Sequence, residues 1–281
     1  MSEKIVLLLR KALLQNDGSV EEIAVEKLLE DIDVNEVDSN GLPLLHQIID
    51  SALPDKTTLV SLVLRHPDID MNAKVSGNDG NTALMQAILN DNILVLKTLL
   101  MTPGIDVNSQ NNLGMTALMW ALAQNNLEAI QLLLKHPDID VNLQMGTGAT
   151  ALMWGVRNNR KAITSLLLSH PKIDVNVQSS NGSTALMGTV CNNFYHLTQL
   201  LLKTPTIDVN IQNDMGETAL MQAVRNNNIA ISCLLLQLPS IDVNIQDHEG
   251  MSALFLAGRN NYLSLAELLL KHPGINPNIR P

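Results

Sequence analysis

A short phrase, Gly-x-Thr/Ser-Ala-Leu-Met/Phe, recurs along this chain at a constant interval of 34 residues. It begins at Gly80, Gly114, Gly148, Gly182, Gly216 and Gly250. A second phrase, Ile-Asp-Val/Met-Asn, and a proline two residues before its isoleucine keep the same rhythm over most of the chain. A constant period of this length is typical of a chain built from one supersecondary unit repeated many times.

The unit that spans residues 148–181 predicts two short antiparallel helices followed by a protruding loop. Thr150 caps the start of the first helix, because its hydroxyl can accept a hydrogen bond from an otherwise unpaired backbone N–H. The pair Asn158-Asn159 ends this helix, since asparagine tolerates the left-handed conformation that reverses a chain. A second helix, apolar along residues 162–168, cannot continue past Pro171. One unit cannot bury its apolar faces alone, so neighbouring units must stack.

The composition fits helices that pack closely in layers. Apolar residues make up 46% of the chain but aromatic residues only 2%, so leucine, alanine, isoleucine, valine and twelve methionines must fill the interior. The formal net charge of −10 argues against a surface that grips phosphate backbones, because such surfaces carry clustered basic residues. The sequence therefore predicts no nucleic-acid partner.

The sequence also predicts no membrane partner. The apolar run that starts at Ile5 is interrupted by Arg10 and Lys11, which makes it too short for the core of a signal peptide. No stretch approaches the roughly eighteen apolar residues of a membrane span. The two cysteines, Cys191 and Cys233, cannot form a disulfide framework. We therefore expect a soluble, cytoplasmic protein.

The repeated unit resembles the ankyrin repeat, whose usual period is about 33 residues. The matching features are the Gly-x-Thr-x-Leu opening, a small residue three positions after that leucine, the Leu-Leu pair of the second helix and the Asp-Val-Asn before the loop. Alanine replaces the family's usual proline, as at Ala151, and methionine or phenylalanine replaces its usual histidine, as at Met153 and Phe255. The resemblance implies an all-α ankyrin-repeat solenoid of stacked helix pairs with protruding finger loops.

We expect a single ankyrin-repeat domain over residues 1–281. Its predicted parts are an N-terminal capping helix pair (1–37), an atypical first repeat (38–76), five regular 34-residue repeats (77–246) and a C-terminal capping repeat (247–281). Pro43 and His46 in the first repeat match the family's opening. The step from Gly41 to Gly80 is five residues longer than the others, and we place this surplus between the two helices, in the segment 51–58.

The two tryptophans, Trp120 and Trp154, occupy the same position in consecutive repeats. Because successive helix residues advance by about 100°, Trp154 lies opposite the apolar stripe that contains Leu152. The resemblance implies that this second face and the finger loops line a concave groove for a partner, where we expect the two rings side by side. The alternative is that the rings pack against the neighbouring repeat. The candidate partner-binding residues are Trp120, Trp154, Arg157, Met115, Gln86, Gln222, Arg225, Leu256 and Arg259.

Other recurring polar residues have structural interpretations. The histidines that precede the repeat prolines, such as His136 and His170, lie in neighbouring repeats about 10 Å apart, whereas the ligands of one zinc ion lie about 2 Å from it. We expect the aspartate and asparagine of the Ile-Asp-Val-Asn phrase to bond their own turns, and Cys191 to be a spare small residue. The resemblance also matches Asn142 to a position that asparagine hydroxylases modify in eukaryotic ankyrin proteins. The sequence predicts no metal, cofactor or catalytic site.

The predicted function is that of a monomeric, non-catalytic adaptor or scaffold that binds another protein through the groove and the finger loops. Two alternatives remain open. Arrays of near-identical repeats such as these are similar to ankyrin arrays in protists and in bacteria that live inside host cells. In the first alternative, the chain is therefore an effector of such a bacterium that binds a host protein in the host cytosol. In the second alternative, the chain is the targeting subunit of an enzyme.

Overall fold

The computed structural model describes residues 22–53, 55–76 and 79–281. This part of the chain contains fifteen helices and two isolated antiparallel bridges, Lys74 with Thr82 and Gln246 with Ser252, but no longer strand. The predicted all-α class is thereby confirmed. The helices are α2 (Glu22–Glu30), α3 (Leu44–Asp50), α4 (Lys56–Leu64), α5 (Ala83–Leu89), α6 (Ile93–Leu100), α7 (Ala117–Ala123), α8 (Leu127–Leu134), α9 (Ala151–Arg157), α10 (Lys161–Leu168), α11 (Ala185–Cys191), α12 (Tyr195–Leu201), α13 (Ala219–Arg225), α14 (Ile229–Leu236), α15 (Ala253–Arg259) and α16 (Leu263–Leu270).

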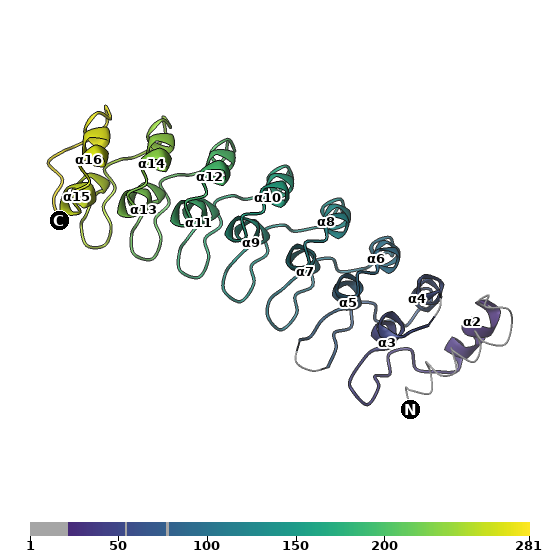
Figure 1. Cartoon of the computed structure of the whole chain (residues 1–281). Coiled ribbons are helices and arrows are strands. Elements are labelled where there is room, and N and C mark those ends of the chain that lie inside the picture. The colour runs from purple at the N-terminus through teal and green to yellow at the C-terminus, as the bar shows by residue number, and fades with distance from the viewer. Residues whose placement is uncertain (1–21, 54, 77–78) are drawn as a thin grey trace. The chain divides into compact units, whose positions relative to one another are not determined.

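The chain divides into two compact units, Met1–Asp140 and Val141–Pro281. In the first unit, α3, α5 and α7 contact one another in order, and α4, α6 and α8 form a second row (Figure 1). In the second unit, α9, α11, α13 and α15 form one row, and α10, α12, α14 and α16 form the other. Each unit is therefore a two-layer stack in which every helix pair packs on the next. The assignment of residues 1–281 to a single domain stays a prediction.

Each regular repeat begins and ends its first helix with the predicted residues. The hydroxyl of Thr184, for example, accepts a hydrogen bond from the backbone N–H of Met187 at 3.3 Å, and the equivalent threonine in the other regular repeats and Ser252 in the last repeat do the same. At the other end, Asn159 has a φ of 51°, in the left-handed region. Asparagine adopts this conformation more readily than most residues, so the sequence fixes where the chain turns into its second helix.

The second helices begin less uniformly. Asn92, Asn126 and Asn228 cap α6, α8 and α14, because each side chain accepts a hydrogen bond from a backbone N–H three residues later. Arg160 takes the same place before α10 with nearly the same backbone angles, but its side chain makes no cap. The start of α10 therefore lacks a stabilising interaction that α6, α8 and α14 have, and Phe194 before α12 and Tyr262 before α16 likewise make no side-chain cap.

The asparagine of the Ile-Asp-Val-Asn phrase bonds the next repeat and not its own turn, which corrects the prediction. Asn176 donates from Nδ2 to the carbonyl of Thr206 at 2.7 Å and accepts at Oδ1 from the N–H of Asp208 at 2.8 Å. The aspartate does bond its own turn, as predicted: Asp174 accepts from the N–H of Asn176 at 2.9 Å. The same asparagine clamp recurs between repeats within both units. Spacing cannot reveal this bond, because its partner lies about thirty residues away.

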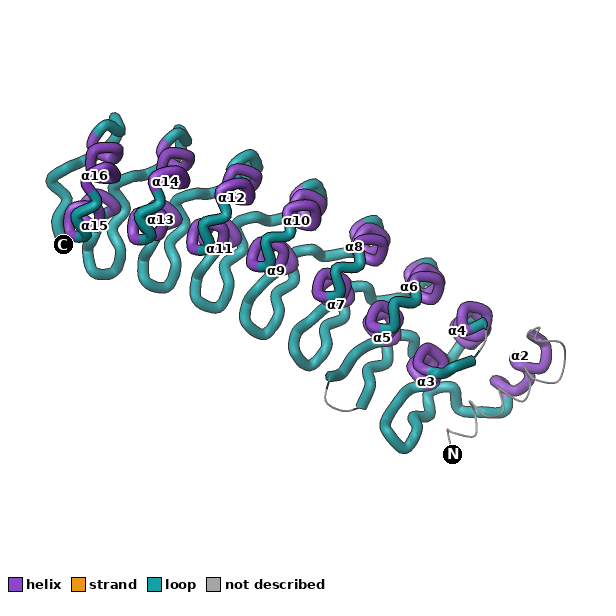
Figure 2. Tube along the Cα trace, in the orientation of Figure 1, coloured by secondary structure: helices purple, strands orange, loops and turns teal. Residues whose placement is uncertain are grey.

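The finger loops project from the helix pairs (Figure 2) and are also bonded from one repeat to the next. Gln178 donates to the carbonyls of Gly182 and Gln212, at 2.7 and 2.9 Å. Gly148 shows why each loop needs its glycine: its φ is +73°, and a Cβ there would lie 2.3 Å from the backbone nitrogen of Ser180. A side chain at this position would push two neighbouring loops apart.

The atypical first repeat differs in part from its prediction. Five residues separate α3 from α4, against three between α5 and α6, and α4 has nine residues where α6 has eight. Three of the five surplus residues therefore precede Pro67, and the other two fall in the loop that leads to Gly80. Of the predicted N-terminal helix pair, the second helix is confirmed as α2, whereas the first lies outside the described residues.

The core consists of aliphatic side chains and methionines. Met85, Met119, Met187 and Met221, at the position of the family's usual histidine, are buried. His46 keeps that histidine in the first repeat, where it is 1% exposed and its Nε2 lies 3.0 Å from the carbonyl oxygen of Asn81 in the next repeat. Pro43 stands in the place of the capping threonine and makes no side-chain cap. No helix in the described ranges has the length and apolar character that crossing a membrane requires.

Candidate protein-binding face

First helices and finger loops meet to form a common surface, which we call the finger-side face. In the second unit it consists of the loops before α9, α11, α13 and α15 together with residues 154, 157, 188, 191, 222, 225 and 259 of those helices. Two observations join the helix residues to the loops. Helix α9 and the loop residues Met145 and Ser179 line the same pocket, and Arg225 of α13 pairs with loop carboxylates. A partner that lies against the helices therefore also touches the loops.

Trp154 lines a pocket of about 320 Å³ on this face. Its indole is partly buried. The same pocket is lined by the exposed Arg157, one turn further along α9, and by Gly188 on α11. The structure thus brings together two of the predicted binding residues, Trp154 and Arg157. The predicted apolar stripe on the opposite side is confirmed, because Leu152 is buried.

Trp120 occupies the corresponding place on α7, in the first unit. The residue is partly buried, and its indole Nε1 is inaccessible to water and has no hydrogen-bond partner among the described residues. Met115 at the start of the same repeat is 9% exposed. Gln86, the equivalent of Trp120 on α5, donates from Nε2 to Asp50 at 2.7 Å. Because the two tryptophans belong to different units, their side-by-side arrangement stays a prediction.

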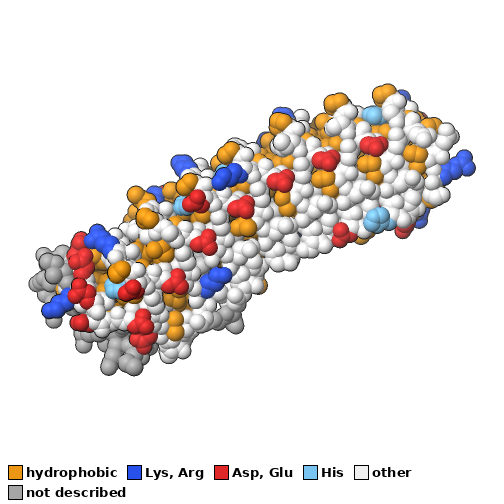
Figure 3. All heavy atoms as spheres, turned by 180° about the vertical axis from the view of Figure 1, so that it is seen from behind, with side chains coloured by type: hydrophobic (Ala, Val, Ile, Leu, Met, Phe, Trp, Pro, Cys, Tyr) orange, Lys and Arg blue, Asp and Glu red, His pale blue; other side chains and the backbone are white. Residues whose placement is uncertain are grey.

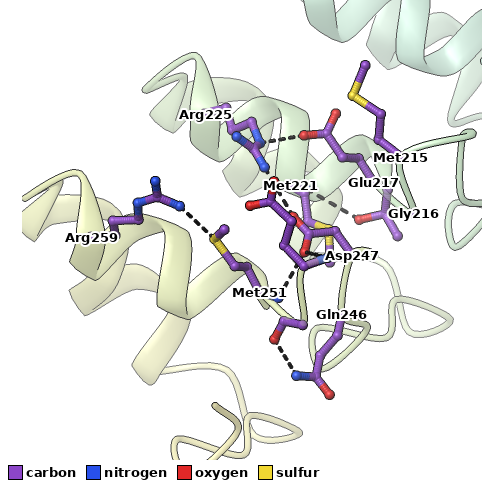
Figure 4. A network of polar contacts seen from close by, with 12 residues as sticks. Met215, Gly216, Glu217, Met221, Arg225, Gln246, Asp247, Met251 and Arg259 are labelled. Atoms are coloured by element: carbon purple, nitrogen blue, oxygen red, sulfur yellow. Dashed lines mark hydrogen bonds and ion pairs between the residues drawn. The ribbon is translucent and has the colours of Figure 1, made fainter. Parts of the chain in front are cut away.

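Arg225 is held between two carboxylates (Figure 4). Its Nε pairs with Glu217 of its own repeat, and its Nη2 lies 3.1 Å from an Oδ2 of Asp247 in the next loop. Both carboxylates are largely buried, while the arginine side chain is 40% exposed. One guanidinium pairs with two buried carboxylates here, so Arg225 is not free to bind a carboxylate of a partner. Its bond to Asp247 holds the next loop against α13.

Gln222 and Leu256 contribute little or no surface to a partner. Gln222 is 8% exposed, and its Oε1 accepts a hydrogen bond from the thiol of Cys191 at 3.2 Å. Cys191 is exposed, but partial burial of its sulfur raises the pKa of its thiol, and the nearby Glu217 carboxylate adds to this effect, which lowers the fraction present as thiolate. Leu256 is 1% exposed, because its apolar side chain lies in the core of the last repeat. Its neighbour Arg259 stays exposed and contacts the sulfur of Met251 at 3.1 Å.

Several residues of this face were not among the sequence candidates, and Gly188, Glu217 and Asp247 matter most for its geometry. The sequence held a signal for one of them, since Gly188 stands where the other regular repeats carry Gln86, Trp120, Trp154 and Gln222 and the last repeat carries Leu256. A missing side chain among large ones marks a gap in a repeating surface. The pairing of Arg225 with Asp247 carried no such signal, because it depends on how the next loop folds back.

The recurring histidines serve their own turns. In each case Nδ1 accepts a backbone N–H two residues on, at 3.3 Å for His66, His136 and His170 and 3.2 Å for His272. On the molecular face seen in Figure 3, acidic side chains recur singly, with apolar and uncharged side chains between them. This pattern is typical of a surface that faces water.

A family model that describes ankyrin repeats in three copies matches residues 12–111, 99–179 and 186–281. The chain belongs to the ankyrin-repeat family. Ankyrin repeats are generally protein–protein interaction modules, and the family is generally non-catalytic. No curated protein matches the sequence of this ankyrin-repeat chain.

Several solved ankyrin structures are similar to this ankyrin-repeat protein. The ankyrin repeat protein EF0377 is 26% identical with a TM-score of 0.60, over 67% of this chain and 96% of its own. An ankyrin repeat domain from Acinetobacter baumannii is also 26% identical, with a TM-score of 0.59 over 66% of this chain and 95% of its own. The ankyrin repeat domain of Bcl-3, a member of the IkappaB family, is 23% identical with a TM-score of 0.66, over 82% of this chain and 96% of its own. The last similarity concerns the fold alone.

Proposed function

We propose that this ankyrin-repeat protein is a non-catalytic adaptor that binds a partner protein through its finger-side face. The observation that carries the proposal is the pocket beside Trp154, where an indole and a guanidinium that pairs with no described residue line the same open surface. Tryptophan and arginine are the residue types most enriched where interfaces concentrate their binding energy. The arrangement supports recognition of another surface.

The other side chains of the face support the same proposal. Within the described residues, Arg157 and Arg259 make no ion pair with the protein itself, whereas Arg225 already has two carboxylate partners. The raised pKa of the Cys191 thiol leaves little of it as the reactive thiolate, which agrees with a role in binding. A monomeric state belongs to the same proposal, and so does a cytoplasmic location, which agrees with the free thiols of Cys191 and Cys233.

Replacement of both tryptophans tests the proposal. The double variant Trp120→Gln/Trp154→Gln uses the residue that the chain itself carries at this position at Gln86 and Gln222. We expect it to lose at least tenfold of the partner that the wild type captures from a cell extract, because one tryptophan hot spot contributes about 2 kcal/mol. The captured proteins are quantified by mass spectrometry.

The matched control is Met101→Gln, which replaces an apolar side chain that is 84% exposed after α6, outside the finger-side face. It should capture the same proteins in the same amounts as the wild type. Equal capture by the double variant and the wild type would show that partners bind elsewhere on the molecule.

A further inference from the structure

Gly188 opens a gap in the finger-side face of the second unit. The equivalent residues on the neighbouring helices, Trp154 on α9 and Gln222 on α13, carry large side chains. At Gly188 a Cβ would meet only the Cγ1 of Val156, at the ordinary contact distance of 3.4 Å. The position thus accepts a Cβ without strain, and the glycine leaves that space free. We call the resulting space of about 320 Å³, which residues 154, 157 and 188 and the adjoining loops line, the Gly188 pocket.

The Gly188 pocket has an apolar part and a polar rim. Met153, Trp154, Val156 and Ala185 supply the apolar surface. Loop side chains such as Asn181 and Ser183 supply hydrogen-bonding groups, as the polar groups of small binding pockets commonly do. A bulky apolar side chain from outside would bury its area against the tryptophan and the methionine, and its own backbone would lie near the polar loop groups.

The charge of the pocket selects an acidic neighbour for that side chain. Arg157 is the only charged residue among those that line the pocket, and it makes no ion pair with any described residue. A guanidinium that pairs with no described residue at an apolar pocket is complementary to a carboxylate, which it can bind with two parallel hydrogen bonds.

We propose that the Gly188 pocket receives one bulky apolar side chain of a partner protein, while an aspartate or glutamate of the same segment binds Arg157. The inference rests on the proposed protein-binding function and names the chemistry of the bound segment. Because the apolar surface and the guanidinium line one pocket, the two partner residues lie within a few positions of each other. Gly188 then determines which partner segments bind, since a large side chain at this position would fill the pocket.

The test uses the full-length chain and a library of random twelve-residue peptides displayed on phage. Peptides selected on the wild type are then measured singly against four variants, one of which is the double variant Trp120→Gln/Trp154→Gln. Gly188→Gln fills the pocket with the residue found at Gln222, and Arg157→Ala introduces the residue found at Ala123. The matched control is Gly258→Gln on α15, where a Cβ would meet no atom within 4 Å. Replacing a helical glycine favours the helix, so neither glycine variant loses binding through unfolding.

We expect the selected peptides to share a bulky apolar residue followed or preceded within three positions by aspartate or glutamate. Their affinity should fall at least tenfold in Gly188→Gln and stay within twofold in Gly258→Gln. In Arg157→Ala it should fall by about threefold to tenfold and depend less on salt, because a rim charge acts largely through screened electrostatics.

The proposal is overturned if the selected peptides bind Gly188→Gln as tightly as the wild type, if they carry lysine or arginine in place of the acidic residue, or if no peptide is enriched. Peptides that ignore Gly188→Gln but lose binding in Trp120→Gln/Trp154→Gln would refute the pocket and leave the proposed function standing. Peptides that bind all these variants equally would refute both.

Discussion

The asparagine clamp between repeats can be tested at Asn176. The change Asn176→Ala removes a donor 2.7 Å from the Thr206 carbonyl and an acceptor 2.8 Å from the Asp208 N–H. A typical hydrogen bond contributes about 0.5–1.5 kcal/mol net. Because both bonds are exposed and water can replace them, the lower half of that range applies, and we expect a loss of roughly 1–2 kcal/mol for the pair.

The loss should be local to one junction of the stack. Since contacts in a repeat array join only neighbours, the protein unfolds in blocks, and one global free energy does not describe it. Urea unfolding should show the midpoint of the second unit lowered by about 0.4–0.8 M, for a denaturant slope of about 2.5 kcal/mol per M. Relative to the wild type, Asn176→Ala should speed hydrogen exchange more in the amides of α11 and α12 than in those of α5 and α6.

Two further variants separate the clamp from the turn beside it. Asn176→Asp keeps the acceptor for Asp208 but sets a carboxylate oxygen against the Thr206 carbonyl, so it should destabilise at least as much as alanine. Asp174→Ala removes only the bond within its own turn and should cost less. If Asn176→Asp unfolds like the wild type, the clamp does not stabilise the stack and the reasoning is refuted.

Two more predictions concern single sites. Arg160→Asn should stabilise α10 by about 1 kcal/mol, as a capping asparagine does, because Asn126 caps α8 from nearly the same backbone angles; an unchanged thermal midpoint would contradict this. Burial lowers the pKa of His46 below its ordinary 6.5, so the unfolded chain takes up a proton before the folded one does. The stability of the first unit should therefore be complete above pH 6.5 and fall as the pH drops through the folded pKa. In urea titrations at pH 7.5 and 5, His46→Met should reduce this fall, and an equal fall in both proteins would refute the assignment.

Local chemistry along the chain was sufficient for most of the fold. The threonine caps, the left-handed Asn159 and the helix-ending prolines are each read from a residue and its near neighbours, and the structure confirms the caps and the turns. The repeat period then required stacking, because no helix pair can bury its apolar face alone. The same spacing placed Trp154 and Arg157 on one face, and the structure brings them to one pocket.

The sequence alone was insufficient where a contact depends on the next repeat. The clamp of Asn176, the pairing of Arg225 with Asp247 and the core position of Leu256 each depend on atoms that stacking brings near. The Gly188 pocket is a similar case, since a glycine in a sequence shows a missing side chain but not the space that neighbours leave around it. The sequence determines which helices and turns each repeat forms by itself, because helix caps and turns depend on residues close together in the chain. The tertiary structure decides which polar groups form hydrogen bonds and which surfaces stay exposed, because both depend on distances between neighbouring repeats.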